Sequence, residues 1–197
     1  MILTVIFEPS VNFESQCVAM DARYRNIPIE TLEFESLCWV HAYWQERKGD
    51  TIGPAWPDID LSAFPTRMVP RVCVMNVTAQ PLDFTYRFWG TAITGIHHYD
   101  LTGQSVKNLT PPAYATCIFN QYKDVYSARA PRAFLTEVPL DNGLLTHYAV
   151  IRLPLSNTSQ NVDGILSVEE YGDQAGDLHE QFEQLWLRTH DTARNPE

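Results

Sequence analysis

Runs of apolar residues along the chain predict five β-strands. The runs are rich in β-branched and aromatic residues and are bounded by turn-forming residues, which is typical of strands. They cover residues 72–77, 83–89, 132–138, 146–154 and 162–171. The first run is almost continuously apolar, so both of its faces are expected to be covered. Asp141-Asn142-Gly143 forms a favourable turn between the third and fourth runs.

Apolar residues at helical spacing predict further elements. Two long helices are expected over residues 31–49 and 113–128, and a single helical turn over residues 91–96. The tail repeats apolar residues at i, i+4, i+7 and i+8, namely Leu178, Phe182, Leu185 and Trp186. This pattern predicts a short amphipathic helix that either packs on the domain or contacts a partner.

The order of these elements predicts the fold class. Two strands, then helices, then three strands indicate an α+β domain with one antiparallel sheet and helices on one face. The domain is expected to span residues 31–171, including its N-terminal helix, with an amphipathic tail over residues 172–197. Residues 1–30 form an N-terminal arm without a clear period, in which residues 1–28 are either loosely packed or add a strand.

One stretch, residues 83–104, combines a strand, a glycine, a short helix and a turn. The aromatic strand ends at Gly90, and Thr91 can cap the helical turn with its hydroxyl group. Asp100 and Gly103 occupy the first and last positions of a turn signal. A unit of this kind can wrap one side of a small pocket, so the stretch is expected to organise the domain.

The same stretch carries a resemblance to a known family. An aromatic strand with Tyr86-Arg87, then Gly90-Thr91, then Asp100-Leu101-Thr102-Gly103 resembles the bacterial stand-alone PAS-domain family. Further matching positions are Tyr43-Trp44, Pro57-Asp58-Ile59-Asp60 and Leu153-Pro154-Leu155-Ser156. The resemblance covers residues 32–171. It implies a five-stranded antiparallel sheet flanked by short helices and a sensory, ligand-binding role, without naming a ligand or a cofactor.

Composition restricts the partners. The chain has 197 residues and a formal net charge of −10, whereas binding to a phosphate backbone needs clustered Lys and Arg. The same charge disfavours an anionic membrane surface. No apolar run approaches the length of a membrane span. We therefore expect neither a nucleic acid nor a membrane as a partner.

The cysteines and the N-terminus favour a cytoplasmic location. Cys17, Cys38, Cys73 and Cys117 are widely spaced and form no CxxC motif. The apolar start of the chain lacks a basic flank and soon reaches Glu8, so it does not read as a signal peptide. Reduced thiols in the cytoplasm are the expected state.

His97, His98 and Arg87 are the polar candidates near the predicted pocket. Adjacent imidazoles do not face the same way, so the pair cannot chelate one ion, and no metal site is predicted. One packed and one solvated histidine is favoured over a haem ligand. Arg87 either forms a structural ion pair, with Asp100 or Glu137, or enters the pocket and binds an anion, depending on the register of its strand.

Aromatic residues cluster on the elements that should surround the core. They either fill the core or line a ligand pocket, because several buried tyrosines need polar partners. The predicted walls are the helical turn after Gly90 and the helix from residue 113, over a floor of sheet residues. The predicted ligand-binding residues are Tyr86, Phe88, Ile93, Ile96, His97, His98, Tyr114, Ile118, Tyr122 and Tyr148.

Signatures of catalysis and photoreception are missing from the sequence. It contains no GxSxG, HExxH, Walker loop or GxGxxG, and no match to the Asn-Cys-Arg-Phe setting of flavin-binding PAS domains. We therefore expect no catalytic residues and a non-enzymatic sensory domain that binds a small molecule and signals through partner contacts, as a homodimer. The alternatives are a ligand-free scaffold and a small α+β enzyme, for which His97, His98 and His147 are the candidate bases.

Overall fold

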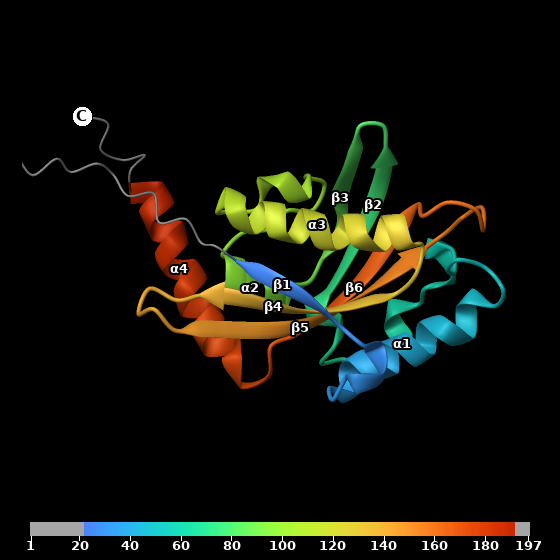
Figure 1. Ribbon diagram of the computed structural model, residues 1–197, viewed down its shortest axis with the longest axis horizontal. Coiled ribbons are helices and arrows are strands. Elements are labelled where there is room, and N and C mark those ends of the chain that lie inside the picture. Colours follow the sequence, from blue (N-terminus) through green and yellow to red (C-terminus); the bar gives the residue numbers. More distant parts are fainter. Residues whose placement is uncertain (1–21, 192–197) are drawn as a thin grey trace, which may run out of the picture.

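The protein is built on one antiparallel sheet of six strands (Figure 1). The computed structural model describes residues 22–191, without the side chains of residues 188–191. The strands are β1 (Arg23–Ile27), β2 (Val72–Ala79), β3 (Leu82–Trp89), β4 (Arg132–Pro139), β5 (Leu145–Leu155) and β6 (Gly164–Glu170), in the order β1-β4-β5-β6-β2-β3. The five predicted strands are confirmed as β2 to β6. The sixth, β1, comes from the end of the predicted arm and pairs with β4; Cys17 and the other residues of 1–21 lie outside the described residues.

Four α-helices accompany the sheet. They are α1 (Glu35–Lys48), α2 (Thr91–His97), α3 (Pro112–Ala128) and α4 (Ala175–Asp191). Short 3₁₀ turns lie at Ile29–Thr31, Trp56–Asp58, Leu61–Ala63, Val69–Arg71, Val106–Asn108 and Gly172–Gln174. The helix expected from residue 31 starts later, at Glu35, because the preceding residues form a 3₁₀ turn and an extended segment. The second long helix and the short helix start within one residue of their predicted positions.

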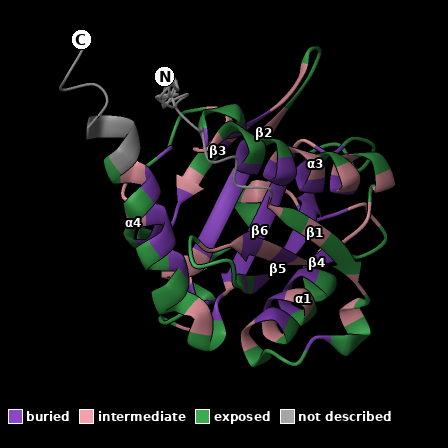
Figure 2. Cartoon of the chain, turned by 60° about the vertical axis from the view of Figure 1, so that its left-hand side comes forward, coloured by how far each residue is buried: buried purple, intermediate pink, exposed green. Residues whose placement is uncertain are grey.

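Both faces of the sheet are covered, and each has its own apolar core (Figure 2). On one face lie α2, α3 and α4, which contribute Ile93, Ile118 and Phe182 to the core. On the other face lie α1 and the proline-rich segment before β2, represented by Trp44 and Phe64. The predicted α+β fold class is confirmed, and the N-terminal helix α1, which the sequence did not assign to a face, covers the second one. The apolar pattern of a helix shows that the helix is buried, but it does not show which face of the sheet the helix covers.

A β-bulge in β3 sets the direction of its aromatic side chains. Met75 of β2 pairs with Tyr86, while the preceding residue pairs with Phe88, so Arg87 is the extra residue. Tyr86 and Trp89 therefore face α3, whereas Phe88 packs on the α1 side. Arg87 is exposed, and its guanidinium lies 5.5 Å from the ring centroid of Trp56. Neither Phe88 nor Arg87 faces the predicted pocket.

Gly90 ends β3 where no side chain fits. A Cβ atom at this position would lie 2.1 Å from the carbonyl oxygen of Pro70. The backbone nitrogen of Gly90 also donates a hydrogen bond to Val72 O at 2.9 Å. The absence of a side chain thus lets the end of β3 approach the start of β2 closely.

Candidate functional site

The core between the sheet and helices α2 and α3 gathers most of the predicted pocket residues. Those that lie in this one cluster are Tyr86, Ile93, Ile96, Tyr114, Ile118, Tyr122 and Tyr148. His97 contacts the same cluster through Tyr114 and Phe182. His98 ends α2 in the left-handed conformation with φ of 64° and is half-buried. Phe88 alone lies on the opposite face of the sheet.

His97 and Trp89 form a buried pair of polar rings beneath α2. Their side chains are 4% and 5% exposed, and their ring centroids are 5.6 Å apart. His97 Nδ1 and Trp89 Nε1 have no hydrogen-bond partner among the described residues. Burial, assisted by the nearby imidazole of His98, lowers the pKa of His97 to about 3. His97 is therefore neutral at physiological pH.

A buried arginine lies at the centre of the same face of the sheet. Arg152 of β5 is fully buried, and its Nε and Nη2 donate to Gln121 Oε1 of α3 at 3.1 and 2.8 Å. Its Nη1 donates to Ser167 Oγ of β6 at 3.1 Å, and its guanidinium lies 3.9 Å from the ring centroid of Tyr122. Gln121 Nε2 in turn donates to Thr136 Oγ1 at 2.9 Å. The guanidinium thus has neutral hydrogen-bond partners and an aromatic face, which compensate part of its desolvation.

Glu169 and three tyrosines continue this polar group toward α4. The Tyr171 hydroxyl donates to Glu169 Oε2 at 2.6 Å, and the hydroxyl oxygens of Tyr114 and Tyr148 are 2.7 Å apart. Burial raises the pKa of Glu169, although the charge of Arg152 and the Tyr171 hydroxyl oppose the rise. We call Gln121, Arg152, Ser167, Glu169 and the three tyrosines Tyr114, Tyr148 and Tyr171 the central polar cluster.

Gln121, Arg152 and Glu169 were not among the predicted site residues. A signal was present, because Arg152 is a charged residue inside the apolar run of β5 and shares the strand face of Tyr148. A charged residue is almost never fully buried unless it is paired, so an arginine inside an apolar run points to buried polar partners.

Helix α4 closes the site on the side of α2. Phe182 lies 4.3 Å from His97 between ring centroids, and the rings of His179 and His98 are 4.8 Å apart. His179 Nδ1 is also 2.8 Å from Gly95 O in α2. The predicted amphipathic tail helix therefore packs on its own domain, and its apolar residues Leu178 and Phe182 are buried there.

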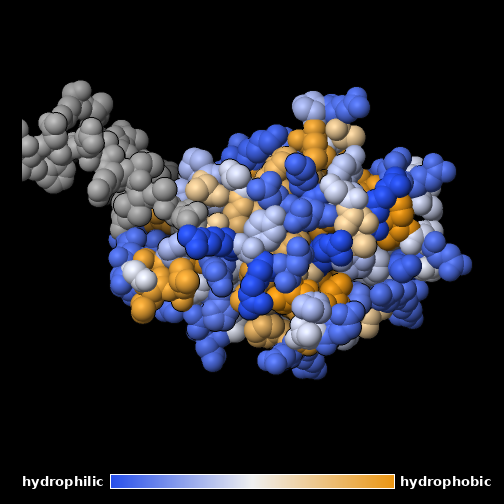
Figure 3. Space-filling view, viewed as in Figure 1, coloured by the Kyte–Doolittle hydropathy of each residue, from blue (hydrophilic) through white to orange (hydrophobic). Residues whose placement is uncertain are grey.

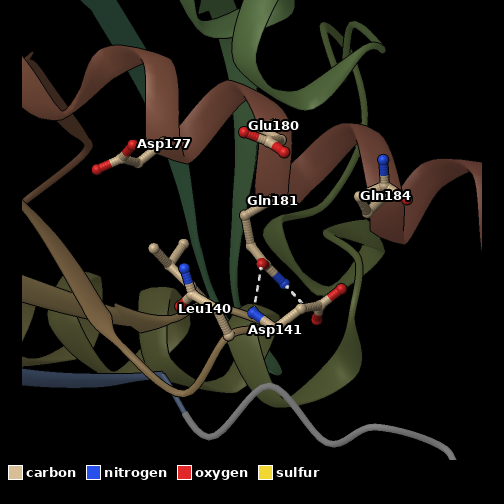
Figure 4. A pocket seen from close by; sticks show the side chains of 7 residues that line it. Leu140, Asp141, Asp177, Glu180, Gln181 and Gln184 are labelled. Atoms are coloured by element: carbon tan, nitrogen blue, oxygen red, sulfur yellow. Dashed lines mark hydrogen bonds between the residues drawn. The ribbon is translucent and has the colours of Figure 1, made fainter.

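Among the surface hollows formed by the described residues, four lie away from this core. The one between the β4–β5 turn and α4 has a volume of about 290 Å³ (Figure 4). Gln181 spans it, since its side chain accepts from Asp141 N at 3.0 Å and donates to Asp141 Oδ1 at 3.2 Å. The others adjoin β1, the start of α1, and Arg87. None of the four is lined by a predicted pocket residue, and none is lined by a residue of the central polar cluster.

Within residues 22–191, no three His, Cys, Asp or Glu side chains are grouped so that they could hold a metal ion. No helix in the same part of the chain is both long and apolar enough to cross a membrane.

Comparison with solved structures finds light-oxygen-voltage (LOV) domains among the similar proteins. The light-state LOV structure of the blue-light photoreceptor Aureochrome1 has a TM-score of 0.37 at 8% identity, covering 61% of this chain and 91% of that one. A fungal LOV photoreceptor has a TM-score of 0.37 at 15% identity, covering 70% and 94%. An RNA-binding LOV receptor has a TM-score of 0.37 at 13% identity, covering 90% of this chain and 46% of that one.

A family match covers most of the chain. A search of the curated proteins finds no match to this chain. A family model described as "PAS domain" matches residues 32–168, which include β2 to β6 up to Val168 and all the predicted pocket residues. This chain belongs to the PAS domain family.

Proposed function

We propose that this chain is a non-enzymatic sensory domain that binds a small molecule between the sheet and helices α2 and α3 and signals through contacts with a protein partner. The central polar cluster carries the proposal. A core that only stabilised the fold would be better filled with apolar side chains, because buried charges and amides are costly to desolvate. Arg152, Gln121 and Glu169 instead bring fully or nearly fully buried polar groups to one place. Such a group of convergent polar side chains within apolar walls is typical of ligand sites.

The partner contact is proposed at the tip of the β4–β5 hairpin. Leu144 and Leu145 are 64% and 62% exposed there, and Figure 3 has a hydrophobic patch at this end of the molecule. The apolar faces of α1 and α4, which suggested a homodimer from the sequence, are instead buried against the chain's own sheet. A second copy of the chain is the first partner to test, by sedimentation of the wild type and of a Leu144→Ser/Leu145→Ser variant.

The ligand proposal is tested by native mass spectrometry and thermal shift. Native mass spectrometry of the purified protein reports bound small molecules and the number of subunits together. A metabolite that binds should raise the melting temperature by roughly 5–10 °C at a hundred times its Kd. Overpacking the site with Ile93→Phe should abolish the shift, whereas Val40→Phe, a matched change in the core under α1, should preserve it.

The scaffold reading remains the second candidate, and one observation favours it. The hydroxyl groups of Tyr114 and Tyr148 satisfy each other at 2.7 Å, so these two tyrosines need no ligand. A broad screen in which no compound stabilises the wild type would favour the scaffold over the sensor. Turnover of any compound in the same screen would favour the enzyme reading instead.

A further inference from the structure

Trp89, His97 and the half-buried His98 carry buried ring nitrogens that lack a hydrogen-bond partner among the described residues, and the first two side chains are the more deeply buried. Trp89 Nε1 and His97 Nδ1 have no hydrogen-bond partner among the described residues, although both side chains are at least nine-tenths buried. Trp44, in the core under α1, differs, because its Nε1 donates to Pro154 O at 2.8 Å. Leaving a buried donor unpaired is unfavourable, and in native proteins such a group usually meets a water, an ion or a ligand.

The chemistry of the two nitrogens defines the missing partner. An indole N–H can only donate, so the group that meets Trp89 must accept. A neutral imidazole Nδ1 donates in one tautomer and accepts in the other. The ring centroids of Trp89 and His97 are 5.6 Å apart, so the two side chains are direct neighbours in this core. A hydroxyl group suits this position because it can accept from Trp89 and donate to His97.

The surroundings determine the rest of the ligand. The other rings within 6 Å of His97 belong to Tyr99, Tyr114 and Phe182. The Tyr99 hydroxyl accepts from Thr110 N at 3.0 Å and the Tyr114 hydroxyl bonds to Tyr148, so both are already occupied. None of these rings carries a charge, and the buried imidazole is neutral. An uncharged ligand with an apolar body therefore fits the walls.

We propose that Trp89 and His97 form the polar anchor of a binding site for a small, uncharged, apolar molecule with one hydroxyl group. The proposal rests on the ligand-binding function proposed above and specifies the class of ligand. Phe182 of α4 makes the closest ring contact with His97, at 4.3 Å, so a ligand at the anchor also contacts α4. Occupancy of the site is thereby coupled to the position of the helix that follows the last strand.

Matched probes test the class of ligand. The probes are p-cresol, toluene, which lacks the hydroxyl group, and benzoate, which is charged. We expect p-cresol to bind the wild type at least tenfold more tightly than toluene, and benzoate not to bind. In a ¹H–¹⁵N spectrum, p-cresol should shift the indole resonance of Trp89, which is assigned by its loss in Trp89→Phe. Trp89→Phe should abolish the preference for p-cresol, whereas Trp39→Phe, on the opposite side of the sheet, should retain it.

The outcomes separate this inference from the general function. Equal binding of p-cresol and toluene, or an unshifted Trp89 resonance in saturating p-cresol, overturns the anchor. If Trp89→Phe does not fold, the shift of the indole resonances in the wild type and the affinities of p-cresol and toluene still test the anchor. If the metabolite screen finds compounds that stabilise the wild type and Trp89→Phe alike, the anchor is wrong while the sensory function stands. If no probe and no metabolite binds, both proposals fail.

Discussion

Acid should destabilise the protein through His97. Burial lowers the pKa of this imidazole from its ordinary value of 6.5 to about 3, with a smaller contribution from His98. Between these two values the unfolded chain binds a proton that the folded protein cannot accept. The free energy of unfolding therefore falls as the pH falls below 6.5, and this loss is complete below about pH 3.

The magnitude follows from the two pKa values. Lowering the pH from 7.5 to 5.0 protonates nearly all of the unfolded imidazole and almost none of the folded one. The resulting loss of stability is about 2 kcal/mol, and the limit at very low pH is about 5 kcal/mol. Glu169, whose pKa is raised by burial, acts in the opposite direction, because its protonated form is favoured in the folded protein. The effect of His97 must therefore be isolated by comparison with a variant.

The assay is urea unfolding of the wild type and His97→Gln between pH 7.5 and 5.0. The stability of the wild type relative to the variant should decrease by about 2 kcal/mol over this range, because the glutamine does not titrate. His147→Gln, which changes an exposed histidine, serves as the control. A difference between wild type and His97→Gln that stays constant with pH would refute the burial argument.

The remaining predictions concern single positions. Gly90→Ala should reduce stability by on the order of 1–3 kcal/mol because its Cβ would meet backbone, whereas Gly95→Ala, which meets nothing within 4 Å, should not; urea unfolding compares them. Arg152→Met should leave the hydrogen-bonded amide of Gln121 and hydroxyl of Ser167 unpaired and lower the free energy of unfolding by about 1–3 kcal/mol in the same assay. Unchanged stability would contradict the pairing of Arg152 within the central polar cluster. Phe182→Ala should cost about 3–5 kcal/mol by thermal unfolding, against less than about 0.5 kcal/mol for the exposed Leu187→Ala; equal effects would mean that α4 is not packed on the domain.

The strands and helices of the domain were predictable because their signals are local. The apolar run of β2 and the turn at Asp141-Asn142-Gly143 depend on neighbouring residues, and the structure has both where they were expected. The covering of the second face by α1 was not predictable, since it depends on which side of the sheet the chain passes. The residues of β3 also alternate regularly in the sequence, so its bulge gave no local signal.

The site was predicted in part for the same reason. Tyr114, Tyr148 and Tyr86 share the core under α3, as their helix and strand positions implied. The bulge at Arg87 is set by pairing with β2, so strict alternation wrongly put Phe88 on the same face as Tyr86. The importance of Arg152 could not be inferred from spacing, because its partners Gln121 and Ser167 come from other elements.

The burial of β5 on both sides has a consequence for how the molecule comes apart. From Tyr148 to Leu155 every residue of this strand is buried, with Val150 in the core under α3 and Ile151 in the core under α1. Loosening either layer therefore exposes side chains of a strand on which the other layer also depends. The two layers should unfold as one cooperative unit, with the amide protons of β5 among the slowest to exchange with deuterated solvent.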